Sequence, residues 1–486
     1  MTSLSILITN PIFILSVGIL IVVGGIIGLK LHPFLALLLA AFVVAWMTPG
    51  AAIEQFALDK GSTPAAALQL SRKSIGERVA IEFGNTAGKL GILIAMAAII
   101  GKCMLESGAA EKIVRSLLRL VGIKKASVAF LISSFFIGIP VFFDTVIFLM
   151  MPLAKAMSFR IGKDYLLLVL SIMAGAVMAN SLVPPSPGPL FLAVTMQIPV
   201  GVMIVAGTIL GIMTSASGYL FALWANKRMS VPVRDTLDAP LEDIKSNNLK
   251  EDSQLPALWF SLLPIVLPLV FICVDNFINI SPKGNSNHSY SVTKLIQAIH
   301  FLGDKNIALF LAASVALLMV TVQKKDSQFT ITGFVQTALL SGGGIILITA
   351  AGGAFGGMLQ QTGISPQITE LTKQYQMALI PLAFIIAAII RTAQGSATVA
   401  LITASGILSG MANNGQLHYH PLYIGLAIGC GAKLVPWMND AGFWIACKLS
   451  TLTENEALKT FAPLNVVMGI TGLIIILISA TVFPLV

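Results

Sequence analysis

The sequence predicts an all-α, polytopic membrane protein made of two inverted-topology repeats, each with about 5 to 7 membrane segments, re-entrant hairpins and broken helices. Three observations support this fold class. Of the 486 residues, 56% belong to the set AVILMFWYC and only 10% are charged, whereas soluble domains carry roughly 25% charged residues. Long apolar stretches recur along the whole chain, and similar patterns of glycines and helix-breaking residues occur in both halves.

The apolar stretches are the predicted membrane segments, because a helical span takes about 20 residues. They lie at residues 11–29, 33–49, 86–105, 126–157, 164–183, 187–224, 256–275, 305–322, 343–359, 376–410, 421–447 and 463–485. The first stretch has neither a basic segment before it nor a small-residue cleavage site after it, so we expect a membrane segment rather than a signal peptide. Lys30 follows it, which places the N-terminus outside by the positive-inside rule.

Polar connections divide the chain into an N-terminal membrane repeat, a hydrophilic cytoplasmic linker and a C-terminal membrane repeat, at residues 1–225, 226–254 and 255–486. The linker mixes Lys and Arg with acids and contains two prolines. Because basic segments favour the cytoplasm, we expect 226–254 and 324–328 inside and the Asn- and Ser-rich segment 277–304 outside.

An internal repeat relates the two halves. Thr86-Ala87-Gly88 corresponds to Ser341-Gly342-Gly343 at an offset of 255 residues, since 341 − 86 = 255. The same offset aligns two copies of the pattern G-x-x-x-x-x-[ST]-G, at 101–108 and 356–363. Chance similarity between Gly- and Ala-rich apolar segments is the alternative. If each copy has an odd number of crossings, the halves are antiparallel, as in inverted-repeat transporters.

The first predicted break lies at Gly138–Thr145, within an apolar stretch. Pro140 removes an amide donor and disfavours helix at Ile139. Asp144 follows, and an ionisable residue at membrane depth costs about 2.5–3.5 kcal/mol on insertion scales. We therefore expect Asp144 to be a substrate or proton site; the alternative is a proline kink in which Asp144 pairs with a neighbouring helix.

The second predicted break lies at Arg391–Thr398. Gln394, Ser396 and Thr398 offer amide and hydroxyl groups beside Gly395, which allows the helix to unwind. A hydroxyl-rich anion would be bound by donors of this kind. Arg391 follows fourteen residues without charge; it either belongs to the site or snorkels to an interface.

Two further breaks and two glycine-rich segments complete the candidate site. The stretch 180–189 contains four prolines and predicts a re-entrant loop, and 433–442 contains Asn439 and Asp440. The segments 84–88 and 341–344 would each open a helix, and the amides at a helix N-terminus suit a carboxylate.

Other function classes lack their sequence signals. The net charge of +9 comes without a cluster of basic and aromatic residues, so no nucleic acid is expected. Four cysteines lie singly in apolar runs, and the close pair His418 and His420 has no carboxylate or Cys nearby, so we expect no metal and no cofactor. The motifs H-E-x-x-H, G-x-S-x-G and G-x-x-x-x-G-K-[ST] do not occur, which argues against an enzyme or an ATP-driven pump.

At these breaks the sequence resembles the gluconate permease family of bacterial sugar-acid/proton symporters. The resemblance rests on 138–144 (GIPVFFD), 183–189 (VPPSPGP), 393–400 (AQGSATVA), 437–444 (WMNDAGFW) and 457–460 (ALKT). It implies a multi-pass protein of the bacterial inner membrane that takes up gluconate or a related sugar acid with a proton, by alternating access. Transporters of the wider superfamily are homodimers with a scaffold domain and a mobile transport domain, so the resemblance also implies a homodimer.

The resemblance leaves the cargo open. The alternative is a symporter for a hydroxy amino acid such as D-serine, or for another small organic anion, with sodium in place of the proton. Family members carry His where this chain has Ser186, and Ser where it has Pro436 and Ala441. The predicted proton-coupling residues are Asp144 and Asp440. The predicted substrate-binding residues are Asn85, Thr86, Phe143, Asp144, Ser186, Gly188, Ser341, Gly342, Gln394, Gly395, Ser396, Thr398, Asn439 and Asp440.

Overall fold

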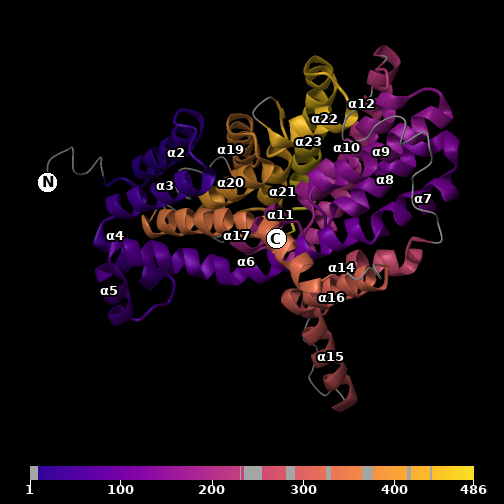
Figure 1. Cartoon of the computed structure of the whole chain (residues 1–486). Coiled ribbons are helices and arrows are strands. Elements are labelled where there is room, and N and C mark those ends of the chain that lie inside the picture. The colour runs from indigo at the N-terminus through magenta and orange to yellow at the C-terminus, as the bar shows by residue number, and fades with distance from the viewer. Residues whose placement is uncertain are drawn as a thin grey trace.

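The computed structural model describes residues 9–229, 231–234, 254–280, 290–323, 330–363, 376–412, 417–437 and 440–485 (Figure 1). All regular secondary structure in these ranges is helical, as predicted. Seven of the described helices are long and apolar enough to cross a membrane, and up to nine spans result if each sharply bent pair counts as one. The protein is therefore a multi-pass α-helical membrane protein.

The N-terminal half contains two short helical pairs followed by the longest helix. The helices are α2 (Pro11–Ile27), α3 (Pro33–Met47), α4 (Gly50–Asp59), α5 (Pro64–Arg72), α6 (Ile75–Glu106), α7 (Ala109–Val121), α8 (Ala126–Gly138), α9 (Phe143–Ile161), α10 (Tyr165–Leu182), α11 (Pro187–Thr195) and α12 (Val200–Arg228). In the C-terminal half they are α14 (Leu258–Ile280), α15 (Tyr290–Gly303), α16 (Lys305–Gln323), α17 (Ile331–Gln361), α19 (Leu379–Gln394), α20 (Ala397–Ala412), α21 (Leu422–Gly431), α22 (Ala441–Ser450) and α23 (Glu454–Val482).

All four predicted breaks in apolar sequence are present. One separates α8 from α9, a second α19 from α20, a third α10 from α11, and the fourth α21 from α22. The stretch 187–224, predicted as one segment, is divided between α11 and α12. Hydropathy alone did not predict α4, α5, α7 or α15, because these helices are short or amphipathic and contain too many polar residues for an apolar run.

The prediction that 84–88 and 341–344 begin helices is wrong. Both segments lie inside long helices, α6 and α17, which start about ten residues earlier, at Ile75 and Ile331. The Oγ of Ser74 accepts a hydrogen bond from the Glu77 amide at 3.2 Å and caps the start of α6. A glycine inside a helix costs only about 1 kcal/mol, and the two helices pack along each other. The polar connection predicted at 277–304 is likewise helical over 290–303, in α15.

Helix lengths and spacings repeat between the halves. α6 and α17 have 32 and 31 residues, and α12 and α23 have 29 each. The first residues of α9 and α20 are 254 positions apart (397 − 143), as are those of α11 and α22 (441 − 187) and of α12 and α23 (454 − 200). α6 and α17 lie side by side (Figure 1). These correspondences support a duplication, and the inverted orientation of the copies stays a prediction.

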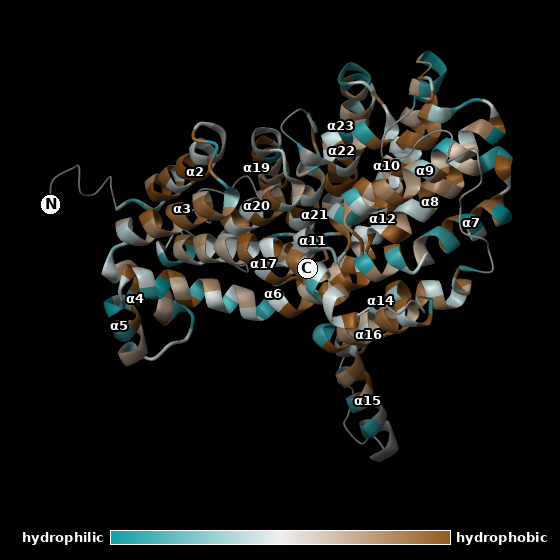
Figure 2. Ribbon diagram, in the orientation of Figure 1, coloured by the Kyte–Doolittle hydropathy of each residue, from teal (hydrophilic) through white to brown (hydrophobic). Residues whose placement is uncertain are grey.

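The core of the molecule lies around α10, in which every residue from Tyr165 to Leu182 is buried. A helix that is apolar on all sides is expected at the centre of a bundle, and α8, α9, α12 and α23 pack against α10. Figure 2 shows that apolar residues also cover the outer helices. Close backbone approach explains two glycines here: a Cβ at Gly175 would lie 2.3 Å from the Ser134 Oγ, and one at Gly207 would lie 2.1 Å from the Leu182 carbonyl oxygen.

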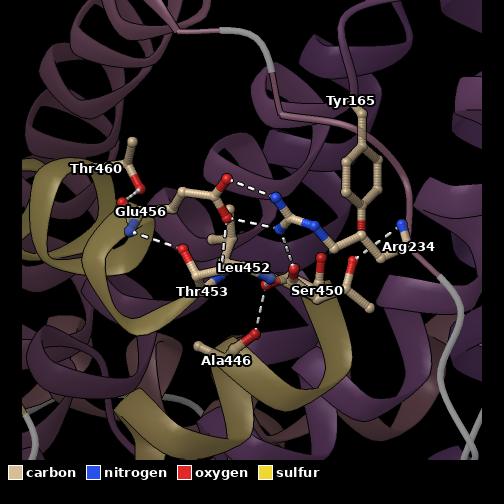
Figure 3. A network of polar contacts seen from close by, with 9 residues as sticks. Tyr165, Arg234, Ala446, Ser450, Leu452, Thr453, Glu456 and Thr460 are labelled. Atoms are coloured by element: carbon tan, nitrogen blue, oxygen red, sulfur yellow. Dashed lines mark hydrogen bonds and ion pairs between the residues drawn. The ribbon is translucent and has the colours of Figure 1, made fainter.

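The beginning of the linker is bound to the C-terminal half (Figure 3). The guanidinium of Arg234 donates to both carboxylate oxygens of Glu456, at 2.7 and 2.8 Å, and to the carbonyl oxygen of Thr451 at 2.7 Å. Next to it, the Tyr165 hydroxyl of α10 donates to the carbonyl oxygen of Ser450 at 2.7 Å. The end of α22 and the start of α23 are thereby attached to both the linker and the core. The linker boundary of 226 falls within α12, and most of the linker, 235–253, lies outside the described residues.

Candidate functional site

A cavity of about 450 Å³ lies where the broken helices of both halves meet. Its polar and charged lining comes from α9, α10, α19, α20, α23 and the segments that precede α20 and α22. The lining residues include Phe143, Asp144, Asn180, Arg391, Gly395, Ser396, Thr398, Lys433, Asp440, Phe461 and Asn465. The structure thus brings together chain segments that are far apart in the sequence, one group from each half.

Asp144 lies in the first turn of α9, directly after the break at Pro140. The break leaves backbone groups without helical partners, and the side-chain amide of Asn180 donates to the carbonyl oxygen of Val141 at 3.4 Å. Asn180 is in turn held by Ser186, whose hydroxyl donates to its carbonyl oxygen at 2.8 Å. Ser186 is 3% exposed and does not line the cavity, so it supports the site through Asn180 instead of touching a ligand.

The second break supplies the opposite wall. Gly395 adopts a left-handed φ of +81°, which glycine accepts without strain, and its amide donates to the Arg391 carbonyl oxygen at 2.8 Å to end α19. α20 starts two residues later, and Thr398 occupies its second position, as Asp144 does in α9. Equivalent positions of the two copies therefore line one cavity, with a carboxylate in one copy and a hydroxyl in the other.

Arg391 forms a buried ion pair with Asp440, so it does not snorkel to an interface. The arginine residue is 5% exposed and the aspartate 6%. One carboxylate oxygen of Asp440 accepts from Arg391, and the other accepts from the Gly442 amide at 2.8 Å as the N-cap of α22. Both oxygens of Asp440 are thus engaged. The Nε and Nη1 atoms of Arg391 are buried without a hydrogen-bond partner among the described residues.

Lys433 brings a second cation to the cavity. It follows α21 and is 6% exposed, yet it lies on the cavity wall. Within the described ranges its ammonium group makes no hydrogen bond or ion pair, and its interactions are electrostatic, with Arg391, Asp440 and Asp144. A buried ammonium group with no direct partner is costly to keep, which makes Lys433 a functional candidate.

Aromatic and amide side chains complete the wall. Phe143 stacks on Phe461 of α23, with ring centroids 6.1 Å apart and an interplanar angle of 9°. Asn465, one turn further along α23, is buried and donates to the Phe461 carbonyl oxygen at 2.8 Å. Sequence reasoning did not single out Phe461 or Asn465, because neither lies at a predicted break, and Asn180 was named only as the first residue of the third break. Lys433 was named only as the first residue of the fourth break.

Several predicted site residues lie away from the cavity. The described backbone places Asn85, Thr86 and Gly342 within α6 and α17, outside the cavity lining, and a Cβ added at Gly188 would meet the Leu401 side chain at 2.4 Å. Asn85 and Thr86 lie inside α6, about ten residues after its start, where no free helix end exists to bind an anion. The side chains of Ser341 and Gln394, and all of Asn439, lie outside the described residues.

The arrangement suits a small polar anion. Two basic groups, two acidic groups and hydroxyls or amides surround a cavity whose volume lies in the range of small-molecule binding sites. The first-turn amides of α9 have no side-chain cap, so they add donors near Asp144. In the part of the chain that the structure describes, no group of three or more His, Cys, Asp or Glu side chains is arranged to hold a metal ion.

Comparison with known proteins identifies relatives over nearly the whole length. A family model described as "GntP family permease" matches residues 62–482. The gluconate permease of Pseudomonas aeruginosa is 29% identical over 455 residues, which cover 93% of this chain and 94% of the relative. The low-affinity gluconate transporter of Escherichia coli is 30% identical over 405 residues, covering 82% and 86%. The L-idonate transporter of the Gnt-II system of Escherichia coli is 26% identical and covers 96% of this chain and 98% of the relative.

Solved structures share the fold at low sequence identity. The YdaH transporter of Alcanivorax borkumensis has a TM-score of 0.59 at 12% identity, covering 84% of this chain and 88% of that one. MtrF of Neisseria gonorrhoeae, described as illuminating a class of antimetabolite efflux pumps, has a TM-score of 0.57 at 16% identity, covering 83% of each chain. At these identities the likeness concerns the fold alone.

Proposed function

The chain belongs to the GntP family of permeases, and from this premise we propose that it takes up gluconate or a related sugar acid together with protons. As a family member with at least seven candidate membrane-spanning helices in its described part, it is a multi-pass protein of the bacterial inner membrane. Its relatives are permeases, which are not enzymes. The homodimer implied by the family resemblance stays a prediction.

The observation that carries the proposal is the cavity between the broken helices of the two halves. Irregular backbone at membrane depth is tolerated where it is buried in protein or lines a water-filled cavity, and substrate sites of secondary transporters lie at such breaks. Both copies of the repeat contribute to the cavity wall. A movement of one copy against the other would therefore open the cavity to one side of the membrane and then to the other. This supports alternating access.

Within the cavity, Asp144 is the better candidate for the proton. Its carboxylate is exposed to the cavity and makes no hydrogen bond or ion pair within the described residues. Asp440, the other predicted proton-coupling residue, already uses both oxygens in the Arg391 pair and the α22 cap. Protonation of Asp440 would break a buried ion pair, and leaving one partner of such a pair unpaired costs several kcal/mol.

The test is uptake of labelled gluconate into proteoliposomes that contain the purified protein. An inward proton gradient is expected to drive accumulation above the equilibrium level, whereas a sodium gradient at equal pH is not. Unlabelled competitors would then rank the candidate substrates by how strongly each inhibits uptake. The panel comprises idonate, fructuronate, D-serine and a dicarboxylate. Accumulation driven by sodium alone, or competition by D-serine and not by sugar acids, would contradict the proposal.

A further inference from the structure

The ionisable groups of the cavity are balanced in number. Asp144, Asp440, Arg391 and Lys433 are the Asp, Glu, Lys and Arg residues among the described residues that line it. With all four ionised, their formal charges sum to zero. Each interacts electrostatically with others of the group, as the mutual influence of Asp144, Asp440 and Lys433 shows.

The four groups differ in how firmly they are bound. Arg391 and Asp440 form a direct ion pair, which is further fixed because Asp440 caps α22. Asp144 and Lys433 make no direct bond among the described residues and differ in exposure: the aspartate is open to the cavity, and the lysine is 6% exposed. The Arg391–Asp440 pair is therefore structural, whereas Asp144 and Lys433 each remain available to a proton or a ligand.

Net charge inside such a cavity is unfavourable. At low effective dielectric constant an uncompensated charge loses far more solvation than it does at the surface. A monocarboxylate that enters the balanced cavity leaves it with one excess negative charge. Uptake of one proton by Asp144 removes that excess and leaves the Lys433 ammonium available to the substrate carboxylate.

We propose that Lys433 is the residue that binds the substrate carboxylate and that Asp144 takes up the proton, so that the cavity accepts one monoanion with one proton. This inference rests on the proposed function and deepens it. When the substrate binds, a carboxylate oxygen of Asp144 gains the proton and no covalent bond of the substrate changes; the proton leaves Asp144 when the substrate is released. The empty and the loaded cavity are then both neutral, so transport moves no net charge.

The substrate class follows from the same balance. A sugar acid with one carboxylate satisfies Lys433, whereas an acid with a second carboxylate, such as glucarate, brings one more negative charge than the cavity has cations to balance. We expect that half-inhibition of labelled gluconate uptake needs an about 10- to 100-fold higher concentration of glucarate than of unlabelled gluconate. Equal competition by the two acids would overturn the proposed selectivity.

The principal experiment separates the proton gradient from the membrane potential. In proteoliposomes, valinomycin and a potassium gradient set the membrane potential. Uptake of labelled gluconate is measured under two conditions: with a pH gradient at zero potential, and with a potential at equal pH on both sides. The pH gradient is expected to drive accumulation, and the potential alone is expected to have no effect. Accumulation that responds to the potential would overturn the one-to-one balance while leaving proton-coupled uptake in place. Absence of any pH-driven accumulation would instead contradict the proposed function.

Variants test the role of Lys433. Lys433→Gln is expected to raise the KM for gluconate about 10- to 100-fold, as loss of a charge-assisted bond implies, and Lys433→Arg is expected to retain more affinity because it keeps the charge. Lys60→Gln, at an exposed position after α4, is the matched control and should leave KM unchanged. An unchanged KM in Lys433→Gln would overturn the assignment. If that variant does not fold, as judged by thermal unfolding, the potential and glucarate measurements on the unmodified protein still decide the charge balance, and a KM of Lys433→Arg equal to that of the unmodified protein supports the role of the positive charge while a loss of all uptake by folded Lys433→Arg contradicts it.

Discussion

Asp144 places a carboxylate at membrane depth, where it costs free energy, and its side chain faces a cavity. Its helix begins at a break caused by Pro140, and the side chain faces a cavity that also contains Lys433, Arg391 and Asp440. A carboxylate at membrane depth costs about 2.5–3.5 kcal/mol on insertion scales. The alternative in which Asp144 pairs with a neighbouring helix finds no support, because no bonded partner occurs among the described residues. A residue in such surroundings can exchange a proton without breaking structural bonds.

Replacement of Asp144 by Asn is expected to uncouple transport. The variant Asp144→Asn has no titratable group at this position, so a pH gradient would no longer drive accumulation of gluconate. Exchange of labelled for unlabelled gluconate across the membrane is expected to continue, because Lys433 remains. The measurement compares net accumulation with exchange in the same proteoliposomes. Unchanged pH-driven accumulation would show that another group carries the proton.

At the scale of elements, the breaks are stabilised by particular side chains. Asn180 bonds the carbonyl freed near Pro140, and the Trp437 indole donates to the Thr392 carbonyl oxygen at 2.7 Å near the end of α19. Between α21 and α22, Val435 has a left-handed φ of +41°, which is strained for a β-branched residue. Backbone strain of this kind is found where neighbouring structure enforces it, often at functional sites.

Packing of α12 against the end of α10 predicts an effect of Gly207→Ala. The added Cβ would lie 2.1 Å from the Leu182 carbonyl oxygen, so the helices must move apart, and overpacking typically costs about 1–3 kcal/mol. A lower temperature of thermal unfolding in detergent and slower uptake are expected, because Leu182 directly precedes the break before α11.

Gly84→Ala is the matched control for this variant. Gly84 also lies inside a long helix, but a Cβ there would meet nothing within 4 Å. Alanine is favoured over glycine in helix interiors by about 0.5–1 kcal/mol, so this variant should unfold at the same or a slightly higher temperature. If both variants behave alike, close packing of α12 on α10 does not limit stability.

At the scale of the whole molecule, the described helices of the two halves pack directly on each other. α6 lies along α17, α12 packs on α23, and Arg78 of α6 donates to the Gln361 side chain of α17 at 3.1 Å. The Arg234 and Tyr165 bonds attach the start of the linker and the core to the region between α22 and α23. The cavity, too, is made by both halves.

These contacts predict that the protein can be divided within the linker. Co-expression of residues 1–244 and 245–486 as two chains is expected to restore gluconate uptake, since the interfaces between the halves do not depend on a covalent connection there. Neither chain alone should transport. A division after residue 173, within the buried helix α10, is the control and should abolish uptake. Failure of the linker division alone would show that the connection is needed for assembly.

Membrane class, the four breaks and the charged residues at them were predictable from the sequence because each has a local cause. Apolar composition excludes a soluble fold, Pro140 and the prolines at 184–189 interrupt helices through their own backbone, and Asp144 is conspicuous in an apolar run. The helix starts at Ile75 and Ile331 were missed, because glycines near the middle of a helix look locally like its end although tertiary packing overrides their low propensity.

What only the tertiary structure decided is which of these local features meet. It places Asp144, Thr398 and Lys433 around one cavity, pairs Arg391 with Asp440, and leaves Asn85 and Thr86 elsewhere. A sequence reports the cost of placing each polar group in a membrane, residue by residue. An ion pair can offset that cost, or the polar group can remain unpaired and available to a ligand. Which of the two occurs depends on partners that are distant along the chain, and only folding brings those partners together.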